Sequence, residues 1–134
     1  AAVARDNAEM LGLTERVEIH VGDLLAPLAG RRYDMILSNP PYIPTADIAG
    51  LMPDVRSYEP HLALDGGTDG LNIYRRLMAE APMMLKDGGA IAVEVGIDEA
   101  AAVAALAMAH SRIVRTETLK DLAGIERVVV GYTE

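Results

Sequence analysis

The chain of 134 residues contains no cysteine, no tryptophan and no phenylalanine. Without cysteine there is no disulfide bond, no thiolate metal site and no cysteine nucleophile. The same absence suits a reducing compartment, and we expect the chain to work in the cytoplasm. Without these two aromatic residues, aliphatic side chains and the seven methionines have to fill the core.

Positive charge and long apolar runs are also scarce. Lys and Arg number 12 against 20 Asp and Glu, which leaves a formal net charge of -8. Contacts to nucleic-acid phosphates need clustered Lys and Arg, so this charge disfavours a nucleic acid and favours a basic protein as the partner. The sequence has no run of about 18 apolar residues and no basic segment followed by an apolar stretch, so we expect neither a membrane span nor a secretory signal. The three histidines are scattered without ligand spacing, so no metal site is expected.

Apolar periodicity predicts an α/β domain. Thr68 and Asp98 are predicted to cap two of its helices, and Pro82 is expected to kink or break the first of these. Continuously apolar strands, such as the one at 33–38, are typical of a mainly parallel sheet with helices on both faces. The predicted helices cover residues 1–11, 68–85 and 98–110, and the predicted strands cover 17–21, 33–38, 90–95, 112–119 and 127–132.

The residues Asn39-Pro40-Pro41-Tyr42 follow the predicted strand 33–38 directly. The carboxyl end of such a strand is where open α/β sheets bind their ligands. Residues 43–67 then form a connection that is longer than most connections between helices and strands. We expect a functional loop there, with a helical turn.

These four residues suit methyl transfer to a planar amide or amine nitrogen. Asn39 offers a side-chain oxygen and Pro40 a backbone oxygen, and together they accept both N–H hydrogens of such a group. Pro40 and Pro41 lock their φ angles, so the Pro40 oxygen is held rigidly. Tyr42 offers a flat wall for stacking. Positioning of this kind contributes about 7–11 kcal/mol to a reaction. A rigid turn without chemistry is the alternative for the same residues.

Three stretches together resemble the protein glutamine methyltransferases of the HemK/PrmC type. They are NPPYIP at 39–44, YEP at 58–60 and ALDGGTDGL at 63–71. Residues 122–129 are similar to the C-terminal end of that family, so the likeness covers essentially the whole chain. The first stretch alone is shared with amino-methyltransferases of DNA and RNA, whereas the second and third together are much more specific.

The resemblance implies a Rossmann-like S-adenosylmethionine-dependent methyltransferase fold, truncated at its N-terminus so that the first two strands are absent. Residues 1–134 are then the C-terminal part of a catalytic domain. The implied cofactor is S-adenosyl-L-methionine. The implied substrate is the side-chain amide of the glutamine in the Gly-Gly-Gln loop of class-1 peptide chain release factors.

Site residues follow from the same resemblance. Asn39 through Tyr42 hold the glutamine and carry catalysis, and Asn39 also contacts the cofactor. Asp23 corresponds to an acid near the adenine amine, although Asp is equally common as a turn cap. Leu24 corresponds to a residue that packs on the adenine, where the family often has a large aromatic side chain. Glu59 is a candidate substrate contact, with a structural role in the loop as the alternative.

Two features of the family are missing from the chain. The glycine-rich first strand and the ribose-binding acid lie upstream of a helix like the one at 1–11, and no Gly-x-Gly-x-Gly occurs here. We therefore expect the isolated chain to be inactive. In this fold the absent strands separate 17–21 from 33–38, so their loss leaves strand 33–38 with a bare edge. We expect that edge to pair with 17–21, with a second copy in a homodimer, or with residues outside the chain.

Two other functions stay open. An amino-methyltransferase would use the same four residues on a flipped adenine or guanine of DNA or RNA. A non-catalytic, methyltransferase-like interaction module would account for the missing glycine-rich segment.

Overall fold

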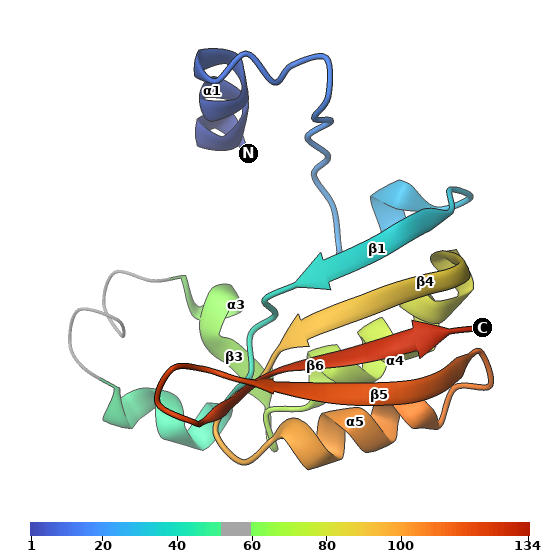
Figure 1. Cartoon of the computed structure of the whole chain (residues 1–134). Helices are drawn as coiled ribbons and strands as arrows, with labels where there is room; N and C mark the ends of the chain where they lie inside the picture. Colours follow the sequence, from blue (N-terminus) through green and yellow to red (C-terminus); the bar gives the residue numbers. More distant parts are fainter. Residues whose placement is uncertain (52–59) are drawn as a thin grey trace. The chain divides into compact units, whose positions relative to one another are not determined.

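The computed structural model describes residues 1–51 and 60–134 (Figure 1). The chain divides into an amino-terminal unit, Ala1–Arg31, and a sheet unit, Arg32–Glu134. The predicted substrate contact Glu59 lies outside the described residues.

The amino-terminal unit holds helix α1, Ala2–Met10, and the 3-10 turn η1, Ala26–Leu28. The predicted helix at 1–11 is therefore confirmed. The predicted strand at 17–21 is wrong: Val17 and Val21 are 39% and 72% exposed, and no strand in the described ranges pairs with this segment. A lone strand leaves its N–H and C=O groups without a ladder, so apolar residues by themselves do not form one.

The sheet unit is built on strands in the order β1-β4-β6-β5. β1, Tyr33–Ser38, runs parallel to β4, Leu85–Glu94. β6, Glu126–Thr133, runs antiparallel both to β4 and to β5, Ile113–Lys120. These strands confirm the predictions at 33–38, 90–95, 112–119 and 127–132, but the sheet is mixed rather than mainly parallel. The short connection between β5 and β6 is the reason, because a parallel pair needs a long crossover.

β6 lies inside the sheet and β5 at its edge. Val129 and Val130 of β6 are buried, whereas Arg115 and Glu117 of β5 are exposed. The apolar strand thus takes the place with a neighbour on each side. The charged strand takes the edge, where its charges discourage pairing with further strands.

Helices α4, Asn72–Met84, and α5, Ala100–Met108, pack against the sheet and against each other (Figure 1). α4 continues through Pro82 without the predicted break, because Pro82 falls in the last turn and removes a single backbone hydrogen bond there. None of the helices in the described ranges is long and apolar enough to cross a membrane. The sequence of the predicted helix 68–85 carries an apolar stripe of six residues. Tyr74, Leu77, Met78 and Ala81 of this stripe are buried in α4, Leu85 is buried at the start of β4, and Leu71 is half-buried.

Both of these helices begin differently from the prediction. Leu71 and Glu99 occupy the N-cap positions, and neither makes a side-chain capping hydrogen bond. The predicted caps Thr68 and Asp98 are therefore wrong. Thr68 lies in the turn before Leu71, and Asp98 has a φ of 66°, outside the β region that an N-cap adopts.

The segment 43–67 contains more structure than the expected loop. β2, Ile43–Pro44, pairs in parallel with β3, Asp65–Gly67, to form a second sheet of two strands. The 3-10 helix η2, Thr45–Gly50, and the helical turn α3, His61–Leu64, lie between them in the chain. The segment therefore leaves the tip of β1 and returns to pair with its own beginning.

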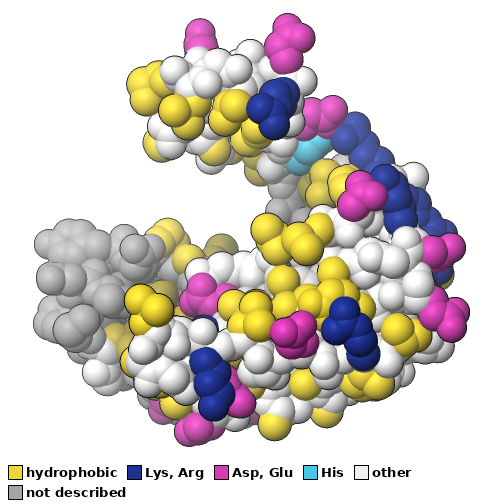
Figure 2. Space-filling view, in the orientation of Figure 1, with side chains coloured by type: hydrophobic (Ala, Val, Ile, Leu, Met, Phe, Trp, Pro, Cys, Tyr) yellow, Lys and Arg dark blue, Asp and Glu magenta, His cyan; other side chains and the backbone are white. Residues whose placement is uncertain are grey.

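One face of β1 is uncovered within the sheet unit. Ile36 is buried, whereas Met35 and Leu37 are 55% and 72% exposed, so the expectation of helices on both faces is wrong for this unit. Figure 2 shows hydrophobic side chains gathered on the surface of the sheet unit. Of the described strands, only β4 pairs with β1. Pairing through a second copy stays a prediction.

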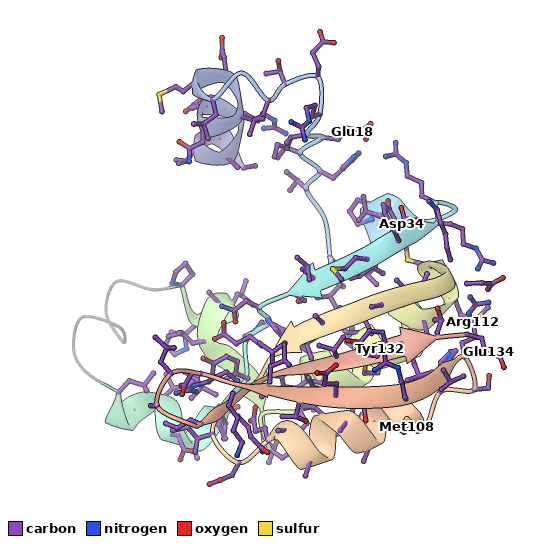
Figure 3. All side chains as sticks on the ribbon, in the orientation of Figure 1. Glu18, Asp34, Met108, Arg112, Tyr132 and Glu134 are labelled. Atoms are coloured by element: carbon purple, nitrogen blue, oxygen red, sulfur yellow. The ribbon has the colours of Figure 1, made fainter. Side chains whose placement is uncertain are left out.

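The end of the sheet where β1 begins is held by ion pairs. Lys86 donates to both oxygens of Asp34 at 2.9 Å and lowers the pKa of that carboxyl. Arg112 donates to Asp87 at 3.0 Å. Figure 3 shows Asp34, Arg112 and Glu134 at this end of the strands. The predicted site lies at the opposite end, beyond the carboxyl tip of β1.

Candidate active site

The four residues from Asn39 to Tyr42 join the two sheets. Ser38, just before them, pairs with Val93 of β4, and Ile43, just after them, pairs with Asp65 of β3. The two prolines fix φ within the link. The segment is therefore anchored at both ends and stiff in the middle, at the carboxyl end of β1 as predicted.

Two hollows meet at Asn39. One of about 180 Å³ is lined by residues 39–43 together with Ala63 and Leu64 of α3. The other, of about 310 Å³, is lined by Asn39 and by Leu37, Ser38, Ala92, Glu94 and Val128. Small-molecule sites commonly measure roughly 300–1,000 Å³. The larger hollow lies at the lower end of that range, whereas the smaller one suits a single side chain.

The two predicted hydrogen-bond acceptors are not engaged elsewhere. Asn39 is exposed, and its carboxamide makes no hydrogen bond to any residue that the structure describes. The Pro40 carbonyl accepts none from the described backbone. Both residues line the smaller hollow, so a ligand bound there would lie beside both of them.

Tyr42 is held through its hydroxyl. The hydroxyl donates to Oε1 of Glu94 at 3.1 Å, across 52 positions of sequence. Burial and the neighbouring Glu94 carboxylate raise the pKa of Tyr42, so the phenol stays neutral and keeps its proton as a donor. The backbone oxygen of Glu94 accepts from the Tyr74 hydroxyl at 2.7 Å, and burial raises the pKa of Tyr74 as well.

Glycines of the third family-like stretch press against Tyr42. A Cβ on Gly66 would lie 2.8 Å from the Tyr42 Cα, and a Cβ on Gly70 would lie 2.5 Å from the Tyr42 backbone oxygen. A Cβ on Gly96 would lie 3.1 Å from the Tyr42 ring. Only glycine allows this approach, because real Cβ atoms do not come so close to backbone atoms. The pattern alone predicts a turn at 66–67 and does not reveal the contact.

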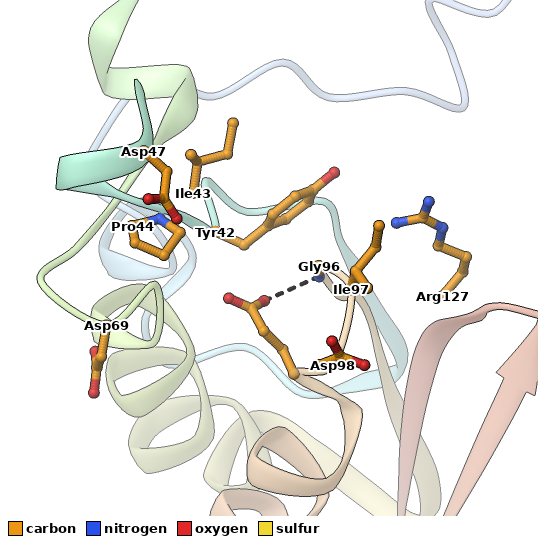
Figure 4. A pocket seen from close by; sticks show the side chains of 10 residues that line it. Tyr42, Ile43, Pro44, Asp47, Asp69, Gly96, Ile97, Asp98 and Arg127 are labelled. Carbon is orange, nitrogen blue, oxygen red and sulfur yellow. Dashed lines mark hydrogen bonds between the residues drawn. The ribbon is translucent and has the colours of Figure 1, made fainter. Parts of the chain in front are cut away.

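Tyr42 also lines an acidic cavity of about 480 Å³ (Figure 4). Glu99 accepts the backbone N–H of Gly96 at 2.9 Å there, and burial raises the pKa of its carboxyl. Arg127 is the basic residue of the lining. The carboxylates of this cavity are contributed by Asp47, Asp69, Asp98 and Glu99.

The predicted cofactor residues are divided between the units. Asn39 belongs to the sheet unit, whereas Asp23 and Leu24 belong to the amino-terminal unit. The sheet unit therefore supplies one of the three residues predicted to bind the methyl donor, and the roles of the other two stay predictions. Among residues 1–51 and 60–134, no group of three or more His, Cys, Asp or Glu is placed to hold a metal ion.

Curated proteins that are similar to the chain are named as release factor glutamine methyltransferases. Release factor glutamine methyltransferases of Moorella thermoacetica and Gloeobacter violaceus are 49% and 47% identical to it over 130 residues, which is 97% of the chain and 46% of each relative. The chain is a relative of the release factor glutamine methyltransferases. It spans about half the length of the curated relatives it matches. No protein-family model matches it.

Solved structures agree with this relationship. The protein-(glutamine-N5) methyltransferase (release factor-specific) of Alicyclobacillus acidocaldarius is 34% identical, with a TM-score of 0.51 over 78% of the chain and 51% of that protein. A methyltransferase of Pyrococcus furiosus is 16% identical, with a TM-score of 0.61 over 96% of the chain and 55% of that protein, and shows the fold alone. The predicted Rossmann-like methyltransferase fold, present in part, is confirmed.

Proposed function

We propose that the chain is the C-terminal part of the catalytic domain of a release factor glutamine methyltransferase. In this proposal it binds the side-chain amide of a glutamine in a class-1 release factor, which receives a methyl group from S-adenosyl-L-methionine. The observation that carries the proposal is the pair of unengaged acceptors, Asn39 and Pro40, beside Tyr42 in one small hollow.

The smaller hollow suits a carboxamide. A primary amide carries two N–H hydrogens on one planar nitrogen, and Asn39 Oδ1 and the Pro40 oxygen each accept one of them. A stiff link holds both oxygens, so the nitrogen is oriented before reaction. Tyr42 offers its ring as a wall for the amide plane.

Positioning explains the reaction better than a base does. An amide nitrogen is a weak nucleophile because its lone pair is delocalised into the carbonyl. The described lining of the smaller hollow contains no histidine, lysine or carboxylate that could act as a base. Orientation contributes about 7–11 kcal/mol in favourable cases, which makes it the main contribution here. When bound, the sulfonium of S-adenosyl-L-methionine supplies a methyl group that is already activated.

The amide proton still has to leave the nitrogen. Asn39 Oδ1 and the Pro40 oxygen hold the two amide hydrogens, but neither oxygen is basic enough to retain a proton. The displaced proton therefore passes to solvent at the mouth of the hollow, where Asn39 is exposed.

The charge of the chain supports a protein partner. The net charge of -8 and the acidic cavity beside Tyr42 both favour a basic surface on the molecule that docks there. The absence of cysteine suits a reducing cytoplasm, where we place the reaction.

The test is transfer of a labelled methyl group from S-adenosyl-L-methionine by the complete gene product that carries this sequence. A purified class-1 release factor should take up label, and the same factor with its target glutamine replaced by alanine should take up none. The 134-residue chain by itself should be inactive. Label in DNA or RNA instead would favour the amino-methyltransferase. No methyl transfer, together with no binding of S-adenosylhomocysteine in calorimetry, would favour the non-catalytic interaction module.

A further inference from the structure

Glu94 is an ionisable residue at the carboxyl end of β4. It pairs with Val128 of β6, and its neighbour Val93 pairs with Ser38, so Glu94 lies level with Asn39, the first residue after β1. Glu94 and Asn39 line the same hollow of about 310 Å³. An ionisable side chain at this place needs a reason, because the neighbouring β4 residues are apolar.

The contacts of Glu94 run in two directions. Its backbone oxygen accepts the hydroxyl of Tyr74, a side chain of α4 with 0% exposure. Its Oε1 accepts the hydroxyl of Tyr42 at 3.1 Å. One end of Glu94 is therefore fixed to the core, and the other end reaches the residue proposed to form the wall of the glutamine hollow.

We infer that Glu94 is a positioning residue whose carboxylate sets the orientation of the Tyr42 ring at the glutamine hollow. This inference rests on the proposed function and deepens it. The backbone of Tyr42 is already held by Gly66 and Gly70. Those contacts leave the side-chain torsions free, and the ring torsion of tyrosine is intrinsically broad. A charge-assisted hydrogen bond at the far end of the ring removes that freedom.

A second contact of the ring supports the same conclusion. Gly96 brings bare backbone up to the ring, at a place where a Cβ would lie 3.1 Å from Cδ2. The Gly96 N–H is itself held by Glu99 at 2.9 Å. The ring and its hydroxyl are thus each held by a separate contact, which supports a fixed orientation of the ring.

The experiment compares Glu94→Gln, Glu94→Ala and Tyr42→Phe in the complete gene product, with kcat and KM measured for release factor. Glutamine keeps an oxygen that accepts the Tyr42 hydroxyl, so Glu94→Gln should retain most of kcat/KM. Glu94→Ala and Tyr42→Phe should each lose about 10- to 100-fold, the scale expected when a reacting group is misplaced by about 1 Å. The double variant Glu94→Ala with Tyr42→Phe should lose no more than Glu94→Ala alone.

Three results would overturn the inference. Equal loss in Glu94→Gln and Glu94→Ala would show that the charge of Glu94 acts on the reacting atoms directly. Additive losses in the double variant would show that Glu94 and Tyr42 act separately. The third is spectroscopic and needs no activity. The phenol that Tyr42→Phe removes from an ultraviolet titration should titrate at lower pH in Glu94→Gln, because the Glu94 carboxylate contributes to the raised pKa of Tyr42. An unchanged titration would mean that this carboxylate does not act on the Tyr42 hydroxyl. An inactive wild type with the expected titration would refute the proposed function alone.

Discussion

Gly70→Ala tests whether the third family-like stretch supports Tyr42. Gly70 has a φ of 76°, and alanine in that region costs about 1–2 kcal/mol. The new Cβ would also lie 2.5 Å from the Tyr42 backbone oxygen and would overlap Oε1 of Glu99. Forcing extra volume into a packed site costs about 1–3 kcal/mol. The lower entropy of the unfolded alanine chain returns about 0.4–1 kcal/mol. The expected net loss is about 1–5 kcal/mol.

The chain offers a matched control in Gly124→Ala. Gly124 has a φ of 82°, and nothing lies within 4 Å of a Cβ built there. It therefore carries the same conformational penalty without the overlap. Urea unfolding of the 134-residue chain and of both variants measures the two free energies of unfolding, with an unchanged slope against urea as the check on the unfolded state.

The difference between the two variants isolates the overlap of the added methyl group with Tyr42 and Glu99. Gly70→Ala should be about 1–3 kcal/mol less stable than Gly124→Ala, which is the overpacking contribution alone. Equal stabilities would refute the reasoning, because they would mean that no rigid atom opposes the added methyl group at Gly70.

Three further predictions concern the surroundings of the site. Tyr74→Phe leaves the Glu94 backbone oxygen without its donor and should destabilise the chain by about 1–3 kcal/mol in urea unfolding, whereas an unchanged midpoint would show that water replaces the hydroxyl. The Arg75 guanidinium lowers the pKa of Asp69 from 3.8 to about 2. The contribution of this carboxylate to stability is therefore present above pH 3.8 and is lost as the pH falls through 2. Asp69→Asn should make the melting temperature less dependent on pH across that window. Burial raises the pKa of Glu99 above 4.5, so the charge of its carboxylate lowers the stability of the chain as the pH rises past that value. The melting temperature of Glu99→Gln relative to wild type should therefore increase from pH 4 to pH 7. A difference that stays constant with pH would contradict this.

Helices and strands whose pattern is set by residues close together in the chain could be predicted from the sequence. The strand at 33–38 and the apolar stripe of α4 follow from local periodicity, and the structure has both. The segment at 17–21 has an apolar residue at every second position, but no described strand pairs with it, and it is no strand. Strand formation thus depends on where a second chain segment lies, which periodicity does not report.

The site divides in the same way. Its centre, Asn39 through Tyr42, is contiguous in the chain, so its place at a strand tip could be predicted. Its supports are distant: Glu94 is 52 positions from Tyr42, and Gly70 approaches the same residue from the end of another segment. Glycine at 70 and glutamate at 94 look like a turn and a strand end in sequence. Their role arises only when folding brings them to one tyrosine.

These distant contacts explain why the specific motifs occur together. The first stretch presents two acceptors and a ring, and any flat NH₂ group satisfies them, whether it belongs to a base or to an amide. The third stretch decides the size of the hollow: its strand β3 pairs with β2 immediately after Tyr42, and Ala63 and Leu64 close the wall. A volume of about 180 Å³ leaves room for a side chain rather than for a whole ligand. In the proposed function, chemistry therefore comes from residues 39–42, and the choice of glutamine comes from what residues 63–71 leave open beside them.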